Sequence, residues 1–111
     1  MNFPSNFSTV DKLESLSKWI IVHSMIYYNF DSSIVSDYAY DRNVKQFMSL
    51  DKTDHKLSKY YYVMYDFTGH TGYHLSSRLN QSHYKEIYDI CSQLLYKSRK
   101  KIDTKNKMEG V

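Results

Sequence analysis

The sequence predicts a mostly α-helical single domain, with room for one short β-hairpin that would make the class α+β. Three observations favour this class. Apolar residues recur at three- and four-residue steps in three separate segments. A serine or threonine suited to capping a helix stands at the start of each segment. The chain has 111 residues, the length of one domain with a modest hydrophobic core.

The first predicted element is an amphipathic helix from about Val10 to Phe30. Ser8 or Thr9 is its expected N-cap, and Asp11 lies in the first turn, where a carboxylate is favourable. The face expected to be buried consists of Leu13, Leu16, Ile20, His23, Tyr27 and Phe30.

A second helix follows a short extended connection that begins with the polar run at residues 31–33. Ser36 is the expected N-cap, Asp37 lies in the first turn, and the helix ends near Leu50. Its apolar face consists of Tyr40, Val44, Phe47 and Met48. Residues 9–50 are therefore predicted to form a helical pair.

Residues 56–102 hold an aromatic segment, a turn and a C-terminal helix. Residues 60–67 are aromatic on every face, so periodicity assigns them no structure, but aromatic and β-branched residues favour a strand. Two glycines within residues 68–72 indicate a turn, so the short hairpin would pair residues 61–67 with 73–75. The last helix starts at a Ser82 cap and ends near Ile102, and residues 103–111 form a frayed basic tail. Its expected buried face is Tyr84, Ile87, Tyr88, Cys91, Leu94 and Leu95.

The composition limits the class of protein. A single cysteine excludes an internal disulfide framework and a four-cysteine zinc site. No apolar run approaches the ~20 residues that a membrane span requires. The N-terminal residues also lack the charged lead and apolar stretch of a secretory signal. We therefore expect a cytoplasmic protein with no membrane contact.

One stretch of the sequence carries a specific motif. Within residues 16–43 stand His23, the run Ile26-Tyr27-Tyr28, Asp31 and the segment Val35-Ser36-Asp37-Tyr38-Ala39-Tyr40-Asp41. This pattern resembles, without a gap, the N-terminal Ia domain of bacterial NAD-dependent DNA ligases. That family usually has a proline where Ser33 stands and a glutamate where Ala39 stands. Residues from Lys52 onward do not resemble the ligase.

The resemblance implies a site for the nicotinamide mononucleotide (NMN) half of NAD, which the ligase Ia domain binds. Carried over position by position, the contacting residues are Tyr27, Tyr28, Asp37, Tyr40 and Asp41. The chemistry suits the ligand, because tyrosine faces attract a cationic pyridinium and carboxylates accept hydrogen bonds from ribose hydroxyls. In the alternative interpretation, the tyrosines only pack the helices and the aspartates only stabilise a helix start.

No catalytic residue and no metal site is predicted. The ligase's adenylation domain, with its Lys-x-Asp-Gly nucleophile motif, has no counterpart here, so we do not expect an enzyme. His70 and His74 have helical metal-ligand spacing, but Gly69 and Gly72 indicate a turn. Cys91 falls on the apolar face of the last helix, which favours a buried and inert thiol.

Three functions remain open. The first is a non-catalytic module that inhibits or modulates a protein partner. Small stand-alone proteins with this ligase-like segment resemble phage products, which points to host machinery such as a CRISPR nuclease as the target (an anti-CRISPR-like role). The second is a binding module for NMN or NAD. The third is a weak nucleic-acid accessory protein that uses the basic tail through Lys97, Arg99, Lys100 and Lys101.

Overall fold

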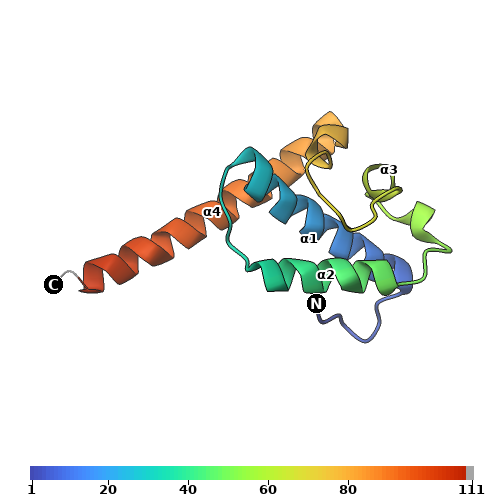
Figure 1. Ribbon diagram of the computed structural model, residues 1–111, viewed down its shortest axis with the longest axis horizontal. Coiled ribbons are helices and arrows are strands. Elements are labelled where there is room, and N and C mark those ends of the chain that lie inside the picture. The colour runs from blue at the N-terminus through green and yellow to red at the C-terminus, as the bar shows by residue number, and fades with distance from the viewer. Residues whose placement is uncertain (110–111) are drawn as a thin grey trace.

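The computed structural model describes residues 1–109, with side chains described for residues 1–100 (Figure 1). Its elements in chain order are α1 Thr9–Asn29, α2 Asp37–Ser49, the 3₁₀ turn η1 His55–Leu57, α3 Tyr61–Met64, the 3₁₀ turn η2 Ser76–Arg78, and α4 Gln81–Glu109. The mostly helical class predicted from the sequence is confirmed.

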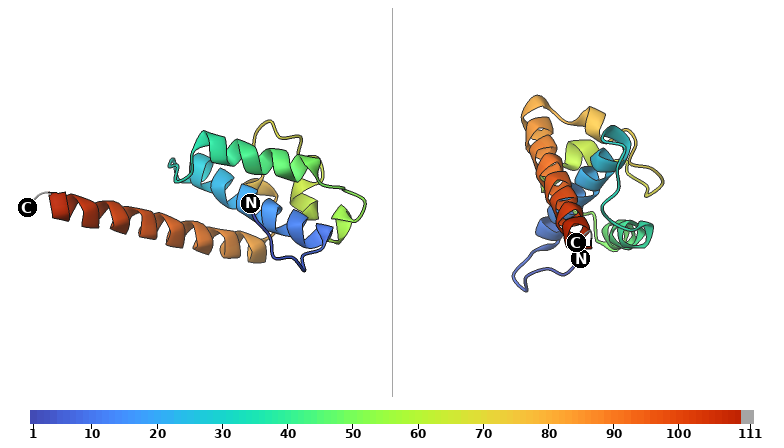
Figure 2. Two further views of the ribbon diagram at one scale, coloured as in Figure 1. Left: turned by 90° about the horizontal axis from the view of Figure 1, so that it is seen from below. Right: turned by 90° about the vertical axis from the view of Figure 1, so that its left-hand side faces the viewer.

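Helix α1 forms the centre of the fold, with α2 packed on one side and α4 on the other (Figure 2). Of the two expected N-cap residues, Ser8 caps the helix, and together with Asp11 it forms a capping box: the Ser8 hydroxyl accepts from the Asp11 backbone, and the Asp11 carboxylate accepts from the Ser8 backbone. Leu13, Leu16 and Ile20 are completely buried, as their spacing predicts. Two members of the predicted buried face differ, because Tyr27 is exposed and Phe30 is half-buried.

The turn between α1 and α2 is made by Asp31, which has a φ of 49°. This left-handed conformation is one that an aspartate adopts more readily than most residues. Helix α2 then starts at Ser36, whose hydroxyl accepts a 3.1 Å hydrogen bond from the Ala39 backbone. On its predicted face Phe47 is buried, but Met48 is exposed.

The aromatic segment is helical, so the predicted strand at residues 61–67 is wrong. Tyr61–Met64 forms α3, and residues 1–109 contain no strand with which a hairpin could form. The buried residues of this segment are Tyr60, Val63, Met64 and Phe67, which recur at helical steps. The exposed tyrosines between them hide this period in the sequence, because they resemble core residues.

The loop after α3 is fastened at its base by Arg78. The Arg78 guanidinium pairs with both carboxylate oxygens of Asp66 and donates a 3.0 Å hydrogen bond to the Val63 carbonyl. These bonds join the two ends of the loop, and between them Thr71 and Gly72 approach α1, where they contribute to the site described below.

Helix α4 differs from its prediction at both ends. Asn80 caps it instead of Ser82, since the Asn80 side chain accepts a 2.8 Å hydrogen bond from the His83 backbone. The helix continues past Ile102 to Glu109 and extends away from the rest of the fold (Figure 2), where the sequence predicted a frayed tail. Residues 110 and 111 lie outside the described residues.

The buried face of α4 is narrower than predicted. Ile87, Cys91 and Leu95 are buried against α1. Tyr84 and Tyr88 are exposed by 40% and 44%, and Leu94 is only partly buried. A tyrosine can lie at the edge of a helix face with its hydroxyl in water, so helical spacing alone overstates the burial of tyrosines.

Candidate functional site

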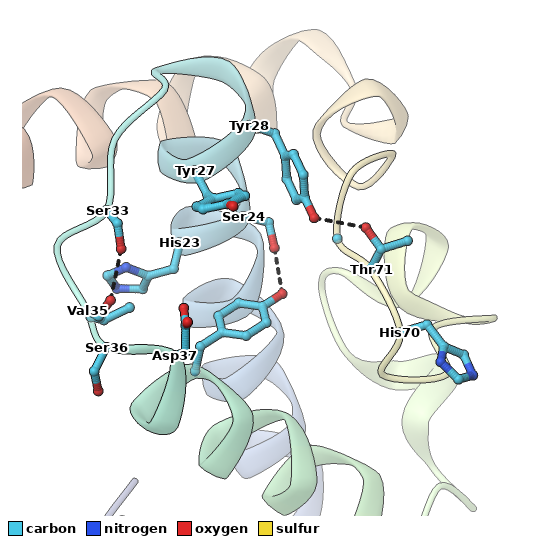
Figure 3. Close-up of a pocket in the computed structure, with 12 residues that line it drawn as sticks. His23, Ser24, Tyr27, Tyr28, Ser33, Val35, Ser36, Asp37, His70 and Thr71 are labelled. Atoms are coloured by element: carbon cyan, nitrogen blue, oxygen red, sulfur yellow. Dashed lines mark hydrogen bonds between the residues drawn. The ribbon is translucent and has the colours of Figure 1, made fainter.

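A pocket of about 200 Å³ opens where α1 ends, α2 begins and the loop after α3 returns to the helices (Figure 3). Three parts of the chain form its walls. The last turns of α1 supply the aromatic wall, and the connection with the start of α2 supplies the opposite wall. Residues 70–72 of the loop close the third side.

Four of the five residues predicted for nucleotide binding line this pocket: Tyr27, Tyr28, Asp37 and Tyr40. They come from two helices that are separated in the sequence by the α1–α2 connection. Figure 3 shows the Asp37 carboxylate pointing from the start of α2 into the pocket. Asp41 is not among the lining residues and lies exposed on α2.

Two tyrosines form the aromatic wall. The rings of Tyr27 and Tyr28 lie edge to face with their centres 4.9 Å apart. The Tyr28 hydroxyl is 3.0 Å from the Thr71 hydroxyl, which ties this wall to the loop (Figure 3). Tyr27 is 57% exposed, so a ligand in the pocket can reach its ring.

Tyr40 and Ser24 form the innermost part of the pocket. The hydroxyls of Ser24 and Tyr40 are 2.9 Å apart, and the Tyr40 ring lies 5.9 Å from that of Trp19. Burial raises the pKa of Tyr40 above its ordinary value, while the Ser24 hydrogen bond opposes that rise. Tyr40 is therefore partly a packing residue, as the alternative interpretation holds for this position.

Gly72 sits directly on this hydroxyl pair. A Cβ atom at this position would lie 2.1 Å from the Ser24 Oγ, 2.7 Å from the Ser24 Cβ and 3.1 Å from the Tyr40 hydroxyl. Only a residue without a side chain fits here, because each of these distances is shorter than a normal contact. The loop consequently approaches α1 at one glycine, and that approach closes the pocket.

His23 contributes a neutral polar group to the pocket wall. It is 91% buried, its ring lies 4.4 Å from that of Trp19, and its Nδ1 atom has no hydrogen-bond partner. Burial lowers the pKa of His23 from 6.5 to about 4, because the charged imidazolium is poorly solvated there. The imidazole is therefore uncharged at neutral pH.

Sequence reasoning missed the pocket roles of Ser24, Thr71 and Gly72. It treated His23 as a residue of the buried helix face and residues 68–72 as a turn alone. The glycines were the available signal, since a glycine outside a tight turn often marks a close backbone approach. Nothing in the local spacing shows that the partner of Gly72 is Ser24 on another helix.

The connection between the helices is shaped by Ser33, at the position where the ligase domains that this segment resembles usually have proline. Its hydroxyl donates a 2.9 Å hydrogen bond to the Val35 carbonyl (Figure 3). This bond fixes the turn that carries the outer pocket wall toward Ser36. The hydroxyl thus provides a local restraint at a position where proline would restrict the backbone directly.

The other candidate groups point away from the pocket or have different partners. Figure 3 shows the His70 imidazole pointing away from the other lining side chains. Among residues 1–100, no three His, Cys, Asp or Glu side chains are grouped as metal ligands. Cys91 is buried, its Sγ donates to the Val22 carbonyl at 3.4 Å, and burial raises its pKa to about 11. A thiol in that state is a poor nucleophile at neutral pH.

The predicted nucleic-acid residues lie on the outer part of α4. Lys97, Arg99 and Lys100 are exposed, and the side chain of Lys101 lies outside the described part of the chain. None of the helices within residues 1–109 is both long and apolar enough to cross a bilayer.

In comparisons with known proteins, the chain matches no protein-family model, no curated protein sequence and no solved structure.

Proposed function

We propose that this protein is a non-catalytic binding module whose pocket holds the nicotinamide nucleoside part of NMN or NAD. The observation that carries this proposal is the convergence of Tyr27, Tyr28, Asp37 and Tyr40 around one pocket. The resemblance to a ligase nucleotide site, which rests on the sequence alone, indicates the same four residues. If these residues served only to pack the helices, there would be no reason for an open pocket where they meet.

The pocket has the chemical groups that this ligand needs. The exposed ring of Tyr27 can stack on a pyridinium, which is attracted to an aromatic face. The Asp37 carboxylate can neutralise the ring charge or accept hydrogen bonds from ribose hydroxyls. A volume of about 200 Å³ is smaller than a typical drug-sized site, which fits a ring with its sugar better than a dinucleotide.

The test is a titration with NMN followed by amide NMR spectra. We expect shifts at Tyr27, Tyr28 and Asp37, with a dissociation constant on the order of 1 mM, about −4 kcal/mol. Asp37→Asn should weaken NMN binding, so that the shifts at a given NMN concentration are smaller, without unfolding the protein, because the side chain is exposed. Asp89→Asn is the matched control, since Asp89 is an exposed carboxylate on α4 and is not among the lining residues.

Asp41→Asn separates the resemblance from the geometry. The ligase pattern assigns Asp41 to the ligand, whereas the pocket lining omits it. We expect the variant to retain at least half of the wild-type affinity. Spectra that stay flat with several millimolar NMN would refute the proposed function.

A second candidate function is the modulation of a protein partner, the first hypothesis raised by the sequence. It is favoured by the large aromatic side chains exposed near the pocket, among them Tyr38, Tyr73 and Tyr27, which are 74%, 70% and 57% exposed. Tyrosine is enriched at protein interfaces because it combines a large contact area with a polar tip. The partner in this proposal is a host protein in the cell that makes the module.

Copurification of the tagged protein from its host, followed by mass spectrometry, tests the second function. Tyr38→Ser and Tyr73→Ser should each release the partner. Tyr96→Ser is the matched control, because Tyr96 is equally exposed but lies on α4. A partner that is retained by both test variants, or none recovered at all, would refute this function.

A further inference from the structure

The pocket has an unbalanced set of charges. Among its lining residues Asp37 is the only carboxylate, and no lysine or arginine is present. His23 adds no positive charge at neutral pH, since burial lowers its pKa to about 4. The remaining polar side chains are the His70 imidazole and several hydroxyls, including those of Ser24 and Tyr40.

The nearest cationic side chains of α2 are placed elsewhere. Arg42 lies over the ring of Tyr38, with its guanidinium 6.0 Å from the ring centre. Lys45 lies farther along the helix and is exposed. Neither of them lines the pocket. A ligand phosphate would consequently find hydroxyl donors in the pocket but no lysine or arginine, and it would be repelled by Asp37.

The tyrosine rings, like the carboxylate, favour a positively charged ligand. Aromatic faces attract a cation through their quadrupole, most strongly where water is partly excluded. Tyr27 and Tyr28 meet edge to face on one side of the pocket, and Asp37 points in from α2 (Figure 3). A flat cation held between these groups contacts aromatic faces and a carboxylate at once.

We propose that the pocket selects for positive charge: it binds a cationic, N-substituted pyridinium nucleoside in preference to the 5′-phosphate of that nucleoside. The inference rests on the proposed function and narrows it, because it identifies the phosphate-free cation as the best ligand. The nicotinamide ring and its ribose occupy the pocket, and a phosphate, when present, stays outside and weakens binding.

Two matched pairs of ligands test the inference. Nicotinamide riboside and NMN differ by the phosphate, and 1-methylnicotinamide and nicotinamide differ by the ring charge. Each is titrated against the full chain at pH 7 and low salt, with amide NMR as the readout. We expect the riboside to bind about fivefold tighter than NMN. We expect the methylated ring to bind about tenfold tighter than the neutral one.

Variants identify the group responsible for the preference. Asp37→Asn should reduce the riboside-to-NMN ratio to about 1, since it removes the charge that repels the phosphate. Asp89→Asn should leave the ratio unchanged, and raising the salt concentration should lower it in the wild type. A ratio that persists in Asp37→Asn would overturn the role of this carboxylate and with it the inference.

The outcomes separate this inference from the proposed function. NMN that binds as tightly as the riboside, or tighter, overturns the charge selection but leaves a nicotinamide-nucleotide site in place. Equal binding of nicotinamide and 1-methylnicotinamide does the same. If none of the four compounds shifts the pocket amides, the proposed function itself fails.

Discussion

Substitution of Gly72 by alanine tests whether the loop closes the pocket by its contact with α1. The added Cβ would lie 2.1 Å from the Ser24 Oγ and 2.7 Å from the Ser24 Cβ. A rotation of the serine side chain relieves only the first clash, because its Cβ is fixed by the helix backbone. The loop must therefore move away from α1.

The expected cost combines overpacking with lost contacts. Overpacking of a fitted site costs about 1–3 kcal/mol. Movement of the loop also breaks the hydrogen bond between Tyr28 and Thr71, worth about 1 kcal/mol. We expect Gly72→Ala to lower the free energy of unfolding by about 2–4 kcal/mol, measured by urea denaturation. With a denaturant slope of about 1–3 kcal/mol/M, the midpoint should fall by roughly 1 M or more.

A double-mutant cycle assigns this cost to one contact. In a Ser24→Gly background the nearest atoms are gone, so Gly72→Ala should cost less than about 1 kcal/mol there. Gly69→Ala is the matched control, because Gly69 has a φ of 86° and its substitution is strained in either background. Equal costs of Gly72→Ala with and without Ser24 would refute the reasoning.

Three further predictions concern stability. Because the unfolded chain protonates His23 near pH 6.5 and the folded protein only near pH 4, the free energy of unfolding should fall by about 3 kcal/mol as pH drops through that range. His23→Gln should flatten most of the slope in urea titrations at several pH values, and His55, whose pKa is also lowered by burial, contributes to the remainder. Phe47→Ala should lower the free energy of unfolding by about 3–5 kcal/mol in the same assay, since Phe47 is 1% exposed and packs against Phe67. Removal of residues 103–111 should shift the thermal midpoint by less than about 2 °C in circular dichroism, because this end of α4 extends away from the fold (Figure 2).

The fold was predictable where one local rule acted alone. The caps at Ser8 and Ser36 follow from side-chain hydrogen bonds to the next turn, which the sequence displays directly. The prediction for the aromatic segment was wrong because some of its tyrosines lie in the core and others lie on the surface. Tyr60 is completely buried while Tyr61 and Tyr62 are 38% exposed, and no sequence rule separates these neighbours.

Only the part of the site that α1 and α2 form was predictable from the sequence. Tyr27 and Asp37 lie close in the sequence, so their relative placement follows from a helix, a short turn and a second helix. The third wall depends on tertiary structure. The bond from Tyr28 to Thr71 and the contact of Gly72 with Ser24 join segments that local periodicity does not relate.

This division limits what the ligase resemblance can say about the ligand. The resemblance ends at residue 43, yet the pocket is closed by residues 70–72, which have no counterpart in the matched pattern. The hydrophobic core also contains residues from outside the resembling segment: Tyr60, Leu75 and Ile87 are completely buried together with the centre of α1. Residues 9–50 are therefore not an independent unit, because they would leave that face of α1 exposed to water. The part of the chain without the resemblance closes the third wall of the pocket, so ligand preference must be measured on the whole chain.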